Sequence, residues 1–211
     1  MILWDRAGRI HEQLAVLWPN TTITEATANQ QGLQSDQVQI VTGLGKSHTV
    51  LKNPVSITKA NEQLAETLKI WNAELELRTY TRVGTRVIYR KIYPTEIEAN
   101  EAVVGSGLVR FPELPIFNHK QASTSCNATL FWKDDSITTQ VILKSEHKNL
   151  AIRDSDFPDL EKPHDLYYVT LDVDRGTRAP VDMEQFRLED WLKGVQHVIA
   201  RDIDKVLNGK S

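Results

Sequence analysis

The residues best suited to chemistry lie in one basic stretch, RTYTRVGTRVIYRKIY, at positions 78–93. Four arginines recur there at every fourth position and one tyrosine lies between the first two: Arg78, Tyr80, Arg82, Arg86 and Arg90. Residues two apart share a face of an extended strand, so the spacing predicts that all five side chains point to one side. Guanidinium groups bind carboxylates and phosphates, and a tyrosine ring can stack on a base, so this face is a candidate binding site.

Three interpretations of this arginine stretch remain open. The arginines can pair with Asp or Glu on neighbouring strands or discourage edge pairing, they can contact an anion or a nucleic acid, or they can contact the acidic surface of a protein partner. The net charge of −3 gives no overall attraction to nucleic acids or anionic membranes, so such binding would need a local basic patch. Gly84, in the middle of the stretch, indicates a bulge or a close backbone approach.

A second candidate site is the pair Asp172 and Asp174 in the segment LDVD. Two carboxylates on one face of a strand can hold a divalent metal or divide acid and base roles, as a metal-dependent phosphodiester hydrolase requires. The alternative is that they pair with the arginine strand, for example through a bridge from Arg82 or Arg86 to Asp172. No further Asp, Glu or His follows at ligand spacing, which favours the structural pairing.

The remaining reactive residues predict no catalytic or cofactor site. His197 is expected on the flank of the last helix, at the surface, and the other histidines form no zinc motif: His11, His48, His119, His147 and His164. Cys126, the only cysteine, alternates with apolar residues, which favours a buried, inert thiol. The segment TGLGKS at 42–47 lacks the first glycine and the following helix of a phosphate-binding loop, so a hairpin turn is predicted. We therefore expect no cofactor.

The elements that position these residues follow from the apolar spacing. Steps of three and four predict helices over residues 2–17, 58–75 and 188–206. Runs of β-formers predict strands at 38–43 and 48–52, a hairpin from 123–132 and 137–144, a strand at 166–174 with one buried face, and a short strand at 108–111. The polar segments 20–37 and 149–165 are predicted to be long loops, and 112–120 a loop or an edge.

Together these elements predict an α+β fold of antiparallel sheets with helices packed on one face. We expect a single domain over residues 1–211, with possible halves 1–93 and 94–211 that form a loose two-fold repeat of strands followed by a helix. The 40% apolar and 25% charged composition is that of a globular protein, and no run reaches the roughly 20 apolar residues that span a bilayer. One cysteine fits a reducing compartment, so a cytoplasmic location is expected.

Several short motifs resemble a sporadically distributed, functionally uncharacterised family of prokaryotic proteins. They are the R-x-G-x-R strand in TRVGTRVIYRKIY, the step LAVLWPN, the helix LAETLKIWNAELEL before the motif, the strand VTLDVDRG and the closing helix DWLKGVQHVIARDIDKVL. The matching positions are Arg82, Gly84, Arg86, Asp172, Asp174 and His197. Relatives usually begin with a further strand, and Arg90 replaces their usual asparagine. The resemblance implies a component of a mobile element or of defence.

The sequence therefore favours a binding protein that uses the basic strand face on an anionic ligand or a protein partner. The alternative is the metal-dependent phosphodiester hydrolase with Asp172 and Asp174. Membrane binding is not expected, and the sequence defines neither the partner nor the oligomeric state.

Overall fold

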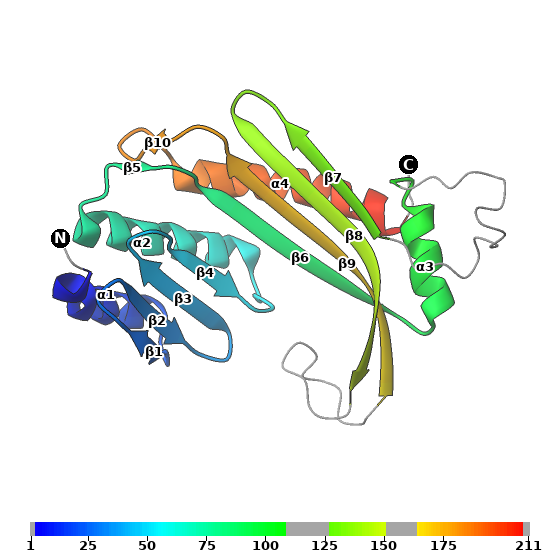
Figure 1. Cartoon of the computed structure of the whole chain (residues 1–211), viewed down its shortest axis with the longest axis horizontal. Helices are drawn as coiled ribbons and strands as arrows, with labels where there is room; N and C mark the ends of the chain where they lie inside the picture. The colour runs from blue at the N-terminus through cyan, green and yellow to red at the C-terminus, as the bar shows by residue number, and fades with distance from the viewer. Residues whose placement is uncertain (1–2, 109–126, 151–163, 209–211) are drawn as a thin grey trace. The chain divides into compact units, whose positions relative to one another are not determined.

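A computed structural model describes residues 3–108, 127–150 and 164–208 of the chain (Figure 1). The chain forms two compact units: Met1–Thr81 with Pro180–Gly194, and Arg82–Ala179 with Val195–Ser211. Helices and open antiparallel sheets make this an α+β fold, as the sequence predicted. The predicted elements within 109–126, including Cys126 and His119, and most of the predicted loop 149–165 lie outside the described residues.

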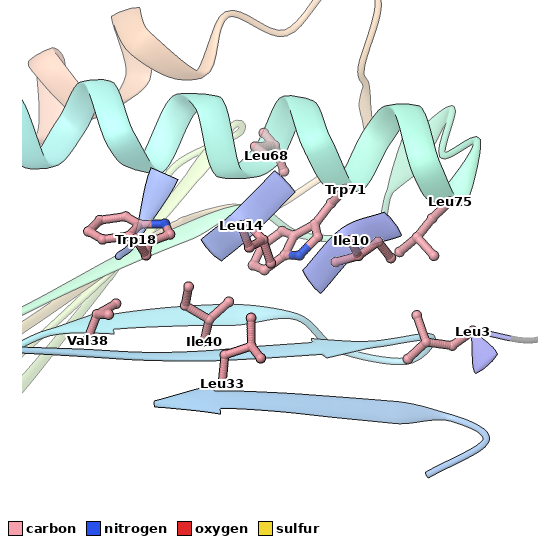
Figure 2. Packing of buried hydrophobic residues seen from close by; sticks show 10 residues of the cluster. All are labelled: Leu3, Ile10, Leu14, Trp18, Leu33, Val38, Ile40, Leu68, Trp71 and Leu75. Carbon is pink, nitrogen blue, oxygen red and sulfur yellow. The ribbon is translucent and has the colours of Figure 1, made fainter. Parts of the chain in front are cut away.

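The first unit packs two helices against a four-stranded sheet. Helices α1 (Trp4–Leu17) and α2 (Ile57–Leu75) enclose strands β1 (Thr22–Ala26), β2 (Gln30–Gln34), β3 (Val38–Gly43) and β4 (His48–Leu51) in the sequence. The strands pair antiparallel in the order β1-β2-β3-β4. Figure 2 shows the side chains of the helices and of the sheet filling the layer between them: Leu3, Ile10, Leu14, Trp18, Leu33, Val38, Ile40, Leu68, Trp71 and Leu75.

Two buried tryptophans each direct the indole N–H to a threonine hydroxyl. Trp71 Nε1 of α2 donates to Thr42 Oγ1 of β3 over 2.8 Å, and Trp18 Nε1, just after α1, donates to Thr67 Oγ1 of α2 over 2.9 Å. A buried donor without a partner is costly, so these threonines allow the large rings to lie in the core.

The predicted loop at 20–37 is wrong, because it contains the hairpin β1–β2. All residues of β1 are exposed, so the strand shows no apolar alternation that a sequence pattern could detect. In β2 the buried positions include the polar Gln31, whose side-chain amide donates to the carbonyl of Ala7 over 3.1 Å. Strand β1 is therefore a polar edge of the sheet, whereas β2 is an internal strand that contributes Leu33 to the core.

The second unit contains a second four-stranded antiparallel sheet with a different strand order. Strands β6 (Gly84–Tyr93), β7 (Asn127–Lys133), β8 (Ile137–Leu150) and β9 (His164–Thr177) lie in the order β6-β9-β8-β7. The hairpin β7–β8 agrees with its prediction in the described residues, and β6 ends at Tyr93, before Pro94, as predicted. Each unit thus has a four-stranded antiparallel sheet, but the strand orders differ.

Helix α3 (Glu96–Gly105), which the sequence analysis did not predict, packs against β6, β8 and β9. Helix α4 (Leu188–Asn208) matches the predicted closing helix, and its residues Val195 and Ile199 are buried. On β9, Val169 and Leu171 are buried as predicted. The opposite side of β9 was expected to be open, but Tyr168, Thr170 and Asp172 are also buried, because β9 is a central strand whose neighbours cover it.

The predicted continuous strand over 78–93 is broken. Strand β5 (Thr79–Tyr80) pairs with β10 (Val181–Asp182) in a two-stranded sheet of the first unit, whereas β6 begins only at Gly84 and belongs to the second unit. The division between the two units falls between Thr81 and Arg82, inside the stretch. In the described residues no helix is long and apolar enough to cross a membrane.

Candidate binding face of the second sheet

One side of the second sheet gathers most of the residues that the sequence singled out. Residues paired in the ladder have side chains on the same side, and Arg86 pairs with Asp174, Ile88 with Asp172, Arg90 with Thr170 and Ile92 with Tyr168. Across β9, β8 adds further residues to this side, because Asp172 pairs with Ile142 and Thr170 with Lys144. We call this side the arginine face: Arg82, Arg86, Ile88, Arg90, Ile92, Gln140, Ile142, Lys144, Glu146, Tyr168, Thr170, Asp172 and Asp174.

Arg86 and Asp172 form a bidentate ion pair at the centre of the arginine face. Arg86 lies directly opposite Asp174 but reaches diagonally to Asp172, donating from Nε over 2.8 Å to one carboxylate oxygen and from Nη2 to the other. The Asp172 side chain is only 10% exposed, whereas that of Arg86 is 60% exposed. The hydrogen bond to Asp172 raises the pKa of Arg86 above its ordinary value. The guanidinium group is thus held in place from below and open to solvent above.

Arg82 lies over two glycines. Its Nη2 donates to Asp174 Oδ1 over 2.7 Å, and Gly84 and Gly176 face each other across β6 and β9 beneath it. A Cβ added at Gly84 would lie 2.6 Å from Arg82 Nη1, and one at Gly176 would lie 2.4 Å from Arg82 Nη2. The predicted close approach at Gly84 is therefore confirmed, and the approaching group is a guanidinium. The ladder begins at the pair Gly84–Gly176 and continues to Tyr93 without a bulge.

A third cluster surrounds Glu146 of β8. Its carboxylate accepts hydrogen bonds from Lys144 Nζ over 2.6 Å and from Thr170 Oγ1, and the Arg90 guanidinium lies 5.9 Å from the centre of the Tyr168 ring. Burial alone would raise the pKa of Glu146, but the two hydrogen bonds and the charges of Lys144 and Arg90 outweigh it, so the pKa lies below its usual value. The carboxylate of Glu146 is therefore negatively charged and held in position by these two hydrogen bonds.

The arginine face is nearly balanced in charge and partly apolar. Its cations are Arg82, Arg86, Arg90 and Lys144, and its anions are Asp172, Asp174 and Glu146. Beside the arginines of β6, Ile88 is 48% and Ile92 52% exposed. The depression beside Arg86 has a volume of about 110 Å³, which suits a small ion or a few waters rather than an organic substrate.

The structure brings together only part of the predicted site. Arg82, Arg86 and Arg90 lie with Asp172 and Asp174, so the bridge from Arg86 to Asp172 considered from the sequence is present. Residues Arg78 and Tyr80 belong to the first unit instead. There the Tyr80 hydroxyl donates to Asn72 Oδ1 over 2.8 Å, and the Arg78 carbonyl accepts from the backbone N–H of Met183. The predicted single stripe of five side chains is wrong.

The weaker sequence candidates lie on other elements of the fold. His197 is exposed on α4, as expected, and TGLGKS forms the turn between β3 and β4, in which Ser47 Oγ donates to the Gly43 carbonyl. Across the described ranges there is no group of three or more His, Cys, Asp or Glu residues arranged to hold a metal ion. Both oxygens of Asp172 and one of Asp174 already accept guanidinium hydrogen bonds.

The contributions of β8 to this face, and a binding role for the isoleucines of β6, were not predicted from the sequence. Lys144 and Glu146 lie where the predicted strand at 137–144 was expected to end, but β8 continues to Leu150. Residues 144–149 are all polar, so no alternation of apolar and polar residues marks the extension of the strand beyond Leu143. The spacing places Ile88 on the same face as the arginines, but no binding role was predicted for Ile88 or Ile92, which are exposed beside them.

Comparison with family models, with curated proteins and with solved structures finds no match to the chain. The resemblance to the uncharacterised prokaryotic family, with its implied role in a mobile element or in defence, stays a prediction.

Proposed function

We propose that the protein is a non-enzymatic binding protein that docks a protein partner on the arginine face. The observation that carries this proposal is the presence of solvent-exposed Ile88 and Ile92 beside arginines that acidic residues hold in place. Arginine is enriched in protein–protein hot spots, and exposed isoleucines gain free energy when a partner removes them from water. An arginine that is already ordered loses less side-chain entropy when a partner binds.

The near balance of charge favours a protein over a nucleic acid. Phosphate binding depends on cations that release counterions, but Arg82 and Arg86 are each neutralised by an aspartate. A protein partner can contact the exposed isoleucines and use acidic residues for the remaining donors of the guanidinium groups. We therefore infer a partner surface that combines apolar side chains with carboxylates.

Site-specific photo-crosslinking tests the proposal. A photoreactive residue at position 88 should give a covalent adduct with a host protein, identified by mass spectrometry, whereas the same residue at Val55, which is fully exposed in the first unit, should not. Introducing Ile92→Asp should abolish the adduct at position 88. The new carboxylate would replace an apolar contact with the partner and would repel the carboxylates of the partner surface. An equal yield at both positions, or an adduct that survives Ile92→Asp, would remove the proposal.

The anionic-ligand interpretation predicts a different result. If the face binds phosphates, retention on heparin should decrease with salt and should fall in a folded Arg82→Ala/Arg86→Ala variant. For a protein-binding face we expect weak retention on heparin, equal in the wild type and the variant.

The hydrolase alternative requires a metal ion to displace Arg86 and Arg82 from the two aspartates. We expect millimolar magnesium or manganese to leave the melting temperature unchanged, because a specific ligand would raise it by mass action. A clear rise that Asp172→Asn eliminates would favour the hydrolase over the binding protein.

A further inference from the structure

Strand β7 forms an exposed edge with an aromatic side chain on each side of the sheet. It is the last strand in the order β6-β9-β8-β7, and within the described part of the chain it pairs only with β8. Phe131 is 55% exposed and Trp132 52% exposed. Because adjacent residues of a strand point to opposite sides, the two rings flank the edge from above and below.

This geometry selects the kind of partner. A protein that lay on one side of the sheet would cover Phe131 or Trp132 but not both. A strand added to the edge would cover both rings and would pair the backbone N–H and C=O groups that an edge strand presents outward.

Strand β6, at the opposite edge of the same sheet, is protected against pairing with a further strand. Along β6, Arg86, Arg90 and Lys91 are exposed, and charged side chains on an edge strand discourage pairing with another strand. In β7 the only charged residue is Lys133, at the end of the strand. An assembly that uses β7 alone cannot extend through β6, so it closes after two copies.

We propose that β7 pairs antiparallel with β7 of a second copy of this chain across a two-fold axis, joining the two sheets. With Leu130 at the axis, each aromatic residue lies opposite a small one: Phe131 faces Thr129, and Trp132 faces Ala128 of the other copy. The Lys133 side chains lie at opposite ends of the shared ladder, each facing Asn127 of the other copy. The strand is therefore complementary to itself in size and in charge. The proposal does not rest on the proposed function, although Thr129 and Phe131 lie on the same side of the sheet as the arginine face.

Analytical ultracentrifugation of the full chain tests the proposal. As the concentration of the wild type rises, its average mass in solution should increase from the monomer mass of 24.0 kDa towards twice that value. Variants Thr129→Lys and Trp132→Lys, at exposed positions, should remain folded by circular dichroism and stay monomeric. The matched control Ile97→Lys, at a 58% exposed position on α3, should dimerise like the wild type. A wild type that is monomeric throughout, or lysine variants of β7 that still dimerise, would overturn the pairing.

A disulfide test separates the two-fold pairing from other dimers. In a Cys126→Ser background, which removes the only cysteine, Leu130→Cys places two thiols at the axis, within bonding distance in an antiparallel pair. Asn127→Cys places them at opposite ends of the ladder. Mild oxidation should give a covalent dimer for Leu130→Cys and none for Asn127→Cys. Cross-linking at both positions alike, or at neither, contradicts the proposed register.

Discussion

The two aspartates of the arginine face lie in different surroundings although they are two residues apart. The Asp172 side chain is 10% exposed and accepts two hydrogen bonds from Arg86, whereas that of Asp174 is 35% exposed and accepts one from Arg82. A carboxylate that is removed from water needs a cationic or hydrogen-bonding partner to remain charged. The two arginines therefore make different contributions to stability.

Arg86→Ala should destabilise the protein more than Arg82→Ala. Removing Arg86 leaves the carboxylate of Asp172 buried without its donors, which costs about 1–3 kcal/mol. Removing Arg82 breaks a more exposed pair, for which about 1 kcal/mol or less is expected. Urea unfolding of the two variants measures both values. Equal losses would mean that burial of Asp172 does not govern the energy of the pair.

Glu146 should contribute to the loss of stability in acid. Its pKa in the folded protein lies below that of an unfolded glutamate, about 4.3, so the unfolded state binds the proton more tightly. The stabilisation is complete above the unfolded pKa and is lost as the pH falls through the folded value. Glu146→Gln should therefore lower stability at neutral pH and flatten the decrease below about pH 4. The free energy of unfolding, measured as a function of pH over this range, gives the test. If it falls with pH equally steeply in Glu146→Gln and in the wild type, the prediction is wrong.

At the scale of the element, the buried indole–hydroxyl bonds connect α2 with the rest of the first unit. Thr42→Val keeps the shape of the side chain but leaves Trp71 Nε1 without its acceptor. We expect a loss of about 1–3 kcal/mol, and a similar loss for Thr67→Val, which removes the acceptor of Trp18. The exposed Thr22→Val on β1 is the matched control, with a change within about 0.5 kcal/mol. Thermal or urea unfolding gives all three values, and a neutral Thr42→Val would show that the indole finds another acceptor.

The elements that could be predicted are those whose own side chains show a period. Helices α1, α2 and α4 carry apolar residues at steps of three and four, and β9 alternates Val169, Leu171 and Val173. Helix α3 has no such signal, because the side chains that it buries are small, such as that of Ala99, while its larger Ile97 is exposed. Strand β1 has no buried side at all.

The candidate site could be predicted only in part, because its geometry depends on register. The sequence indicated that arginines and aspartates could meet, but whether Arg86 reaches Asp172 or Asp174 depends on how β6 pairs with β9. Gly84 indicated a local irregularity, but the β-formers Thr81 and Val83 run up to it, so nothing in the stretch shows that the chain changes sheets there. The change of sheet is set by distant partners, β10 for β5 and β9 for β6.

At the scale of the whole molecule, each compact unit is built from separate parts of the chain. The chain passes from one unit to the other after Thr81, after Ala179 and after Gly194. The first unit therefore needs residues 180–194, which supply β10 as the partner of β5 and place Met183 and Leu188 against its core.

We expect that residues 1–81 alone form an incomplete unit. Without β10, β5 loses its ladder, and without Met183 and Leu188 part of the core loses its cover. A fragment that joins residue 81 to residues 180–194 through a short flexible linker should regain this packing, because Tyr80 pairs with Val181 and the two ends are adjacent. The linked fragment should therefore melt at a higher temperature than 1–81.

The ionisation of Tyr80 gives a local measure of the same effect. Burial raises the pKa of its phenol above the ordinary value. In the fragment 1–81 the phenol should be more exposed, so its pKa should fall, and in the linked fragment it should rise again. Ultraviolet difference spectroscopy during an alkaline titration measures this ionisation. If the two fragments titrate and melt alike, residues 180–194 add nothing to the first unit, and its boundary lies at the end of the continuous segment.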